Sequence, residues 1–172
     1  ERQTSAETLE ADTLEVLADL NHASQKGLQT IFDSSVGRST VNHPLGGRYQ
    51  ITPTEASVQK LPVQHGVTTT ASVMAQGFNP YVAEWSPYHG AAYAVIEATA
   101  RLVAAGANWS KARFSYQEYF ERMDKQAERF GQPVSALLGS IEAQIQLGLP
   151  SIGGKDSMSG TFEELTVPPT LV

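Results

Sequence analysis

The sequence contains no cysteine among its 172 residues. Disulfides, thiolate metal sites and a cysteine nucleophile are therefore excluded, and we expect a cytoplasmic protein. No run approaches the roughly 18 apolar residues that a membrane-spanning helix needs. Runs of lysine or arginine are also absent. With a net charge of −6, the chain is a poor candidate for binding nucleic acid or a membrane surface.

Signatures of common catalytic sites are missing as well. The sequence has no G-x-S-x-G nucleophile elbow, and its four histidines have no metal-ligand spacing. The segment LPSIGGKDSMSGTF (149–162) places a lysine after two glycines, which suggests a phosphate-binding loop. The P-loop pattern fails, however, because Leu149 stands where it needs glycine and Asp156 where it needs serine or threonine. A polar turn with solvated side chains stays open as the alternative.

Hydrophobic residues make up 41% of the chain, which is enough for a sizeable core. Apolar periodicity and turn residues predict alternating helices and strands. The expected helices are 7–20, 90–105, 117–130 and 133–148, and the expected strands are 56–61, 67–75, 111–116 and one from about 165. Long loops are expected at 77–90 and 148–161. This order predicts an α+β fold with a small, mostly antiparallel sheet and helices packed on one face.

The two ends suggest a fragment of a longer polypeptide. The chain begins without methionine, and it stops within a strand-like run, Thr170 to Val172.

One helix face carries a second group of polar residues. Tyr93, Glu97 and Arg101 follow each other at intervals of four, so they share a face of the helix expected at 90–105. A glutamate four residues before an arginine is a common surface pair worth about 0.2–0.5 kcal/mol. Glu55, just before a strand, is in isolation a turn residue. Spacing alone favours a structural role for all of them.

Several longer motifs, taken in order, resemble one family. They are FDSSVGRSTVNHPLGG, GFNPYVAEWSPYHGAAYAVIEATARLVAAG, FSYQEYF, GGKDSMSGTF and VPPTLV. The sequence from Ala23 to Val172 resembles phosphoribosylformylglycinamidine synthase, the large single-chain amidotransferase of purine synthesis. The similar region is the N-terminal domain of its second aminoimidazole-ribonucleotide-synthase-like half. Residues 1–22 would then be a lead-in helix, and 23–172 the synthase-like domain.

The resemblance implies an ATP-dependent ligase reaction. The family uses ATP to activate the amide oxygen of formylglycinamide ribonucleotide, and ammonia from glutamine then displaces that oxygen. A separate glutaminase domain with a cysteine nucleophile supplies the ammonia, and this chain lacks it. We therefore expect further domains as partners, and no activity from this chain on its own.

The resemblance also implies a nucleotide site with Mg²⁺. Lys155, Asp156 and Ser157 match the family's nucleotide-binding G-K-D-S loop, while Glu55 and Glu97 take the places of magnesium ligands. Arg101 stands where the family's helix motif has asparagine, which puts the metal in doubt. The arginine either pairs with Glu97 or reaches a phosphate directly.

Two alternatives stay open beside the ligase. The domain could be purely structural, completing a barrel with a sister domain and holding no nucleotide. It could also belong to another ATP-dependent member of the superfamily, which includes selenophosphate synthetase, thiamine-monophosphate kinase and a hydrogenase-maturation protein. Without a sister domain, we expect a homodimer through the sheet, because strands near 56–75 and 165–172 would leave an open edge.

Overall fold

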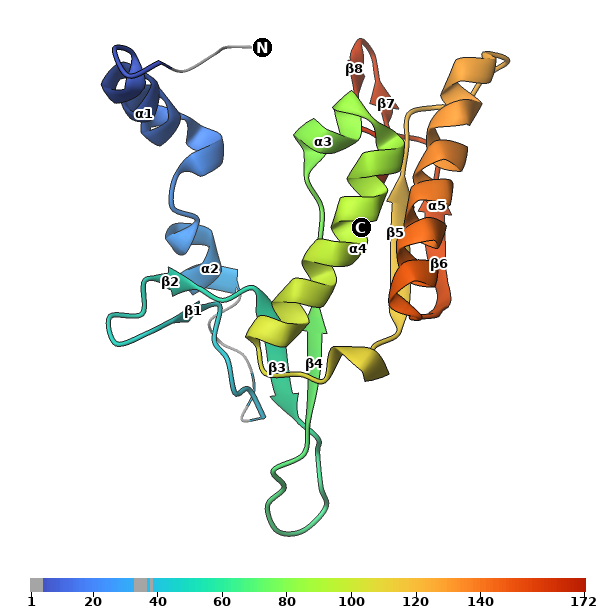
Figure 1. Ribbon diagram of the computed structural model, residues 1–172. Coiled ribbons are helices and arrows are strands. Elements are labelled where there is room, and N and C mark those ends of the chain that lie inside the picture. The colour runs from blue at the N-terminus through green and yellow to red at the C-terminus, as the bar shows by residue number, and fades with distance from the viewer. Residues whose placement is uncertain (1–4, 33–36, 38) are drawn as a thin grey trace. The chain divides into compact units, whose positions relative to one another are not determined.

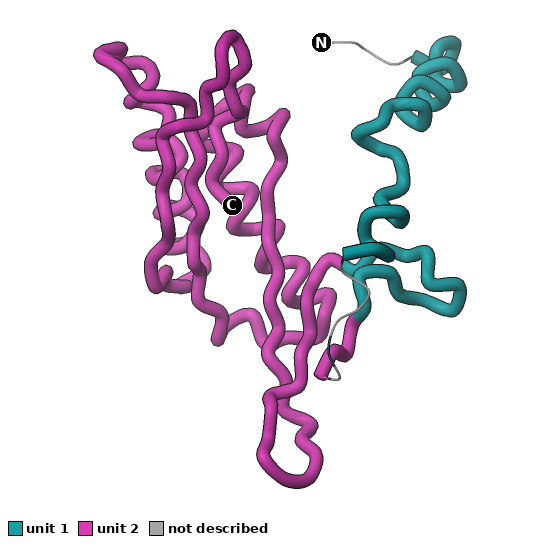
Figure 2. Tube along the Cα trace, turned by 180° about the vertical axis from the view of Figure 1, so that it is seen from behind, with its two compact units in different colours: residues 1–38, 43–54 teal, residues 39–42, 55–172 magenta. Residues whose placement is uncertain are grey.

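The structure is a computed structural model that describes residues 5–32, 37 and 39–172. It comprises two compact units, residues 1–38 with 43–54 and residues 39–42 with 55–172 (Figure 2). The domain boundary expected after residue 22 stays a prediction, because compact units need not coincide with the domains of a family. Within the motif at 32–47, residues 33–36 and 38 lie outside the described residues.

The first unit contains short elements with mostly exposed side chains. Helix α1 (Leu9–Ala18) lies within the helix predicted at 7–20 and is followed by the 3-10 turn η1 (Leu20–His22). Helix α2 is Lys26–Phe32. Strands β1 (Leu45–Gly46) and β2 (Thr52–Pro53) pair in antiparallel fashion.

The second unit begins with the strand pair predicted from its β-rich runs. Strands β3 (Ala56–Lys60) and β4 (Ala71–Ala75) pair in antiparallel fashion, with Val58 opposite Val73. Val58 is buried. The second predicted strand is shorter than expected, because residues 67–70 are not part of it.

The prediction of a long loop at 77–90 was wrong, because this segment contains helix α3 (Pro80–Trp85) and the start of helix α4 (Pro87–Ala104). Each helix has proline in its first turn, where a missing N–H costs nothing. The Asn79 side chain accepts hydrogen bonds from two backbone N–H groups of α3, and the Ser86 side chain accepts one from the His89 N–H of α4. The Asn-Pro and Ser-Pro pairs are thus helix starts rather than turns.

The prediction of a helix at 117–130 was also wrong. After the 3-10 turn η2 (Trp109–Lys111), strand β5 runs over Phe114–Tyr119, three residues later than the strand expected at 111–116. One helix, α5 (Ala127–Leu147), replaces most of the two that were predicted, and it contains Pro133. Gly148, with φ of 67°, ends it in the left-handed conformation that glycine tolerates.

The loop predicted at 148–161 contains strand β6 (Ser151–Ser157), so this prediction was wrong too. Strand β6 pairs in parallel with β5, and β9 (Thr170–Leu171) pairs with the other side of β5 in antiparallel fashion. The order is therefore β6-β5-β9. A small hairpin of β7 (Thr161–Phe162) and β8 (Leu165–Thr166) lies between β6 and β9 in the sequence.

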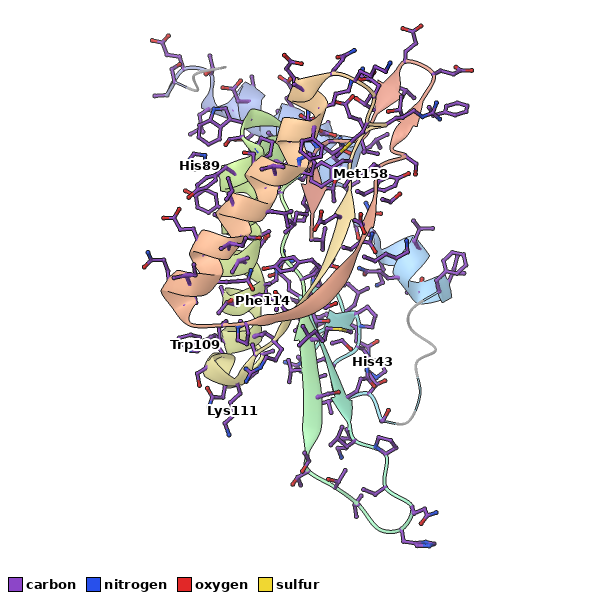
Figure 3. All side chains as sticks on the ribbon, turned by 90° about the vertical axis from the view of Figure 1, so that its right-hand side faces the viewer. His43, His89, Trp109, Lys111, Phe114 and Met158 are labelled. Carbon is purple, nitrogen blue, oxygen red and sulfur yellow. The ribbon has the colours of Figure 1, made fainter. Side chains whose placement is uncertain are left out.

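Helices α4 and α5 pack side by side on one face of this sheet (Figure 1). The side view in Figure 3 places both helices on one side of β5 and β6. Their shared core contains Ala91, Phe120, Ala136 and Leu171. The α+β class is thus as predicted, but in place of one sheet the described residues form four small sheets, which are antiparallel except for the β5–β6 pair. Among the described residues, no helix has the length and hydropathy to span a bilayer.

Candidate functional site

Three of the predicted site residues meet at one corner of the second unit, around the Arg101 guanidinium. Its Nη2 lies 2.9 Å from Glu97 Oε1, one turn earlier on α4. Its Nε lies 3.3 Å from Oε2 of Glu55, the residue just before β3. Of the two possibilities left open for Arg101, the structure thus has the arginine paired with Glu97, and it adds Glu55 as a second partner.

The same cluster holds the turn between β4 and α3. Arg101 Nη1 donates to the Gln76 carbonyl oxygen at 2.8 Å, and the Phe78 N–H donates to Glu97 Oε2 at 2.9 Å. Gly77, between them, packs against the α4 backbone so closely that an added Cβ would lie 2.8 Å from the Ala98 nitrogen. Glycine is therefore required there, and the turn is bound to α4 on both sides of it.

The residues of this corner do not fit a magnesium site. Magnesium prefers near-octahedral oxygen ligands, with one or two carboxylates that are free to coordinate it. Both Glu97 oxygens already accept hydrogen bonds, and Arg101 lies between Glu97 and Glu55. The side chains of Arg101, Glu97 and Glu55 are 24%, 38% and 62% exposed, so solvent reaches the corner mainly at Glu55. Within the described part of the chain, no group of three or more acidic or histidine side chains could hold a metal ion.

The other predicted site residues, Lys155, Asp156 and Ser157, are the last three residues of β6. They lie opposite Gln117, Glu118 and Tyr119 of β5. Because side chains alternate along a strand, Lys155 and Asp156 lie on opposite faces of the sheet. Strand β6 is at the edge of its sheet. The segment is therefore an edge strand and not the phosphate-binding loop that its glycines suggested. Among the described residues, no hydrogen bond or ion pair joins it to the Arg101 corner.

Two carboxylates lie side by side on neighbouring strands near this end of the sheet. Burial, and secondarily the charge of Asp156, raise the pKa of Glu118 above its ordinary value. On the same strand and face, burial raises the pKa of Tyr116 to about 12. The pairing of Glu118 with Asp156 was not predicted, because residue 118 was assigned to a helix and residue 156 to a loop.

An aromatic cluster at the junction of α3 and α4 was also missed. His89 lies 5.0 Å from Trp85 and 5.3 Å from Tyr88, measured between ring centroids. Its Nδ1 lies 2.8 Å from the Ser86 hydroxyl, and the Tyr88 hydroxyl hydrogen-bonds to Glu142 of α5. The four-residue interval from Trp85 to His89 was the available signal, but it lay within the segment assigned to a loop.

Comparison with solved structures identifies the fold. The chain is similar to PurLQS from Thermotoga maritima, with a TM-score of 0.67 and 19% identity over 87% of this chain and 22% of that one. For T. maritima PurL complexed with AMPPCP the values are 0.65 and 18%, over 90% and 24%. For phosphoribosylformylglycinamidine synthase II of the same organism they are 0.57 and 18%, over 69% and 18%.

At these identities the likeness is one of fold, and the chain spans between 18% and 24% of the length of those proteins. No protein-family model matches the sequence, and no curated protein matches it.

Proposed function

We propose that this chain is a domain of an ATP-dependent ligase of the phosphoribosylformylglycinamidine synthase type. The observation that carries the proposal is the fold likeness to T. maritima PurLQS over 87% of the chain. The sequence motifs independently favour the same family. In this proposal the domain works in the cytoplasm with further domains, including a glutaminase, and contributes one wall of a nucleotide site.

The nucleotide contact in this proposal is the carboxyl end of β6. Strands β5 and β6 are parallel, and ligands of open sheets commonly bind beyond the carboxyl ends of parallel strands. Lys155 is exposed there, and Ser157 is two residues further on the same strand, with its hydroxyl 2.9 Å from that of Ser159. An exposed ammonium can contact ATP or ADP phosphates, and a hydroxyl can donate to a phosphate oxygen. The related PurL structure with AMPPCP supports a nucleotide as the ligand class.

The proposal does not place Mg²⁺ between Glu55 and Glu97, because Arg101 engages both carboxylates. Arg101 itself, with contacts to Glu55, Glu97 and Gln76, has little capacity left for a phosphate. These contacts favour the second candidate function, in which the domain supports neighbouring domains and leaves catalysis to another half of the enzyme.

The test is an assay with formylglycinamide ribonucleotide, ATP, Mg²⁺ and free ammonium, which bypasses any glutaminase. It is applied to this chain alone and to a longer polypeptide that carries it. We expect turnover only from the longer polypeptide, because this chain alone cannot close an active site. ADP released by this chain in step with amidine formation would contradict the incomplete site, and no turnover from either would contradict the ligase.

Two lysine variants of the longer polypeptide then separate the two candidate functions. Lys155→Ala should raise KM for ATP if β6 contacts the nucleotide. Lys111→Ala, which removes another exposed lysine from η2, should leave KM unchanged. Equal kinetics for Lys155→Ala and the unmodified polypeptide would favour the structural candidate.

A further inference from the structure

We infer that Arg101 is a built-in cation that occupies the place a divalent metal would take between Glu55 and Glu97. The corner of β3, the β4–α3 turn and α4 is therefore held together without a metal ion. The place of the metal is the one that the resemblance implies for Mg²⁺, and the contacts around Arg101 are the evidence that the arginine fills it.

First, Arg101 opposes the binding of a metal ion at Glu97. Each carboxylate oxygen has two lone pairs, so one hydrogen bond to each does not by itself exclude a metal at Glu97, and the guanidinium beside the carboxylate is the main obstacle. One Glu97 oxygen accepts from the Phe78 N–H at 2.9 Å, and the other accepts from Arg101 at 2.9 Å. A dication approaching Glu97 would also lie close to the fixed positive charge of the guanidinium, which repels it. Binding would require Arg101 to leave.

Second, Arg101 joins separate segments of the chain, as a metal ion would. A metal ion joins ligands from separate segments through one positive centre. The guanidinium reaches three segments through three different nitrogens, since Nε contacts Glu55, Nη1 contacts the Gln76 carbonyl and Nη2 contacts Glu97. A planar fork of donors suits such divergent oxygens, whereas a lysine ammonium offers one point charge. Arg101 is also mostly buried, which limits competition from water.

Third, Arg101 holds the backbone of the turn between β4 and α3. Ala94, Glu97, Ala98 and Arg101 lie on one face of α4 by their spacing. All four face the turn at 76–78, where an added Cβ on Gly77 would clash with the Ala94 carbonyl and the Ala98 nitrogen. The turn leads directly to Asn79, which caps α3. Arg101 thus helps to hold the turn that leads into α3, beside the direct packing of buried Ala83 on Gly90 of α4.

The experiment measures whether a divalent cation and Arg101 are interchangeable. Thermal unfolding of the chain is followed with MgCl₂ and with NaCl at matched ionic strength, and bound Mn²⁺ is counted by electron paramagnetic resonance. We expect no Mg²⁺-specific change in Tm and no Mn²⁺ bound at this corner in the unmodified chain. Arg101→Gln should lower Tm by a few degrees, on the order of 2–4 °C. Mg²⁺ should restore most of that loss.

Matched variants distinguish this from a general effect of salt. In the double variant Arg101→Gln/Glu97→Gln, Mg²⁺ should no longer raise Tm. Arg113→Gln makes the same chemical change at an arginine that, within the described residues, donates to the carbonyls of Lys111 and Ala112, so it should gain no Mg²⁺ response. Arg101→Lys, which keeps the charge, should also gain none.

Two results would overturn the inference. One is Mn²⁺ binding by the unmodified chain that Glu97→Gln removes, because the corner would then be a metal site despite Arg101. The other is a failure of Mg²⁺ to stabilise Arg101→Gln, because the arginine would then hold no place that a metal can fill. If Arg101→Gln does not fold, the Mn²⁺ titration of the unmodified chain and of Glu97→Gln still decides the first point.

Discussion

Glu118 carries a carboxylate in an unfavourable place, half-buried on β5 and next to Asp156 on β6. Both burial and the neighbouring negative charge disfavour its ionised form, so its pKa is raised in the folded state. Between its ordinary pKa and the raised value, the folded protein binds more protons than the unfolded chain. Stability therefore falls as pH rises through that window.

We expect Glu118→Gln to raise Tm at neutral pH, because the amide has the same shape and no charge to bury. The gain should shrink as pH falls from the raised pKa to the ordinary pKa of a glutamate, and below both values the unmodified side chain is itself protonated. Thermal unfolding of both proteins across this pH range measures the difference. A difference in Tm that is independent of pH would contradict the assigned cause, and Asp156→Asn should produce a smaller change of the same sign.

Only part of the Arg101 cluster could be predicted from the sequence. The pairing of Glu97 with Arg101 follows from their four-residue interval on a helix that the apolar pattern predicted correctly. The contact with Glu55 needed tertiary structure, since it depends on how β3 lies beside α4. The contacts with Gln76 and Phe78 were not foreseeable either, because backbone groups in a turn leave no signal in the side-chain sequence.

At the scale of elements, the packing of α5 on α4 depends on small residues. Side chains that α5 buries are small or compact, whereas its large apolar side chains are exposed: Phe130, Val134, Leu137, Leu138, Ile141 and Ile145. Gly139 lies against the Tyr88 carbonyl, and an added Cβ would be 2.8 Å from the carbonyl carbon. The two helices thus approach through their backbones at this point.

Two glycines of α5 provide a matched pair of substitutions. Alanine in place of glycine normally stabilises a helix interior by about 0.5–1 kcal/mol. Gly131→Ala should do so, because no atom outside the helix's own backbone lies within 4 Å of the added Cβ. Gly139→Ala should instead destabilise the protein by about 1–3 kcal/mol, because the helices must separate. Denaturant unfolding measures both, and stabilisation by Gly139→Ala would contradict the close packing.

The elements that sequence analysis missed have local sequences that oppose their final structure. Strand β6 includes Gly153 and Gly154, which weaken strands in general. Gly154 is nevertheless suited to its place, because a side chain there would meet the Tyr116 carbonyl. Pro133 suggested a helix boundary, yet α5 continues through it. In both cases tertiary packing outweighs propensity, and the packing partners are distant in sequence.

At the scale of the whole molecule, self-association through the sheet stays a proposal. Strands β6 and β9 are the edges of the three-stranded sheet, and edges with unpaired backbone groups favour association. Ile152 on β6 is 76% exposed. The exposed apolar side chains of α5 offer a competing surface, and Ile145 there is 72% exposed.

A matched pair of isoleucines distinguishes these surfaces. We expect the unmodified chain to show concentration-dependent association in sedimentation velocity. Ile152→Lys should shift the distribution towards monomer, since an edge lysine opposes strand pairing, and Ile145→Lys should leave it unchanged. The reverse pattern would transfer the interface to α5, and a clean monomer at high concentration would rule out association.

The strand order β6-β5-β9 differs from the order in which the ribosome synthesises these strands. Strand β5 is the central strand, yet both of its neighbours follow it in the chain. Phe120, which is fully buried in the finished protein, leaves the ribosome before the residues of β6 and β9 that help to enclose it. At ordinary rates of elongation that interval lasts roughly 3–10 s. For those seconds the nascent chain presents an unpaired strand beside an uncovered phenylalanine, which is the surface that chaperones bind.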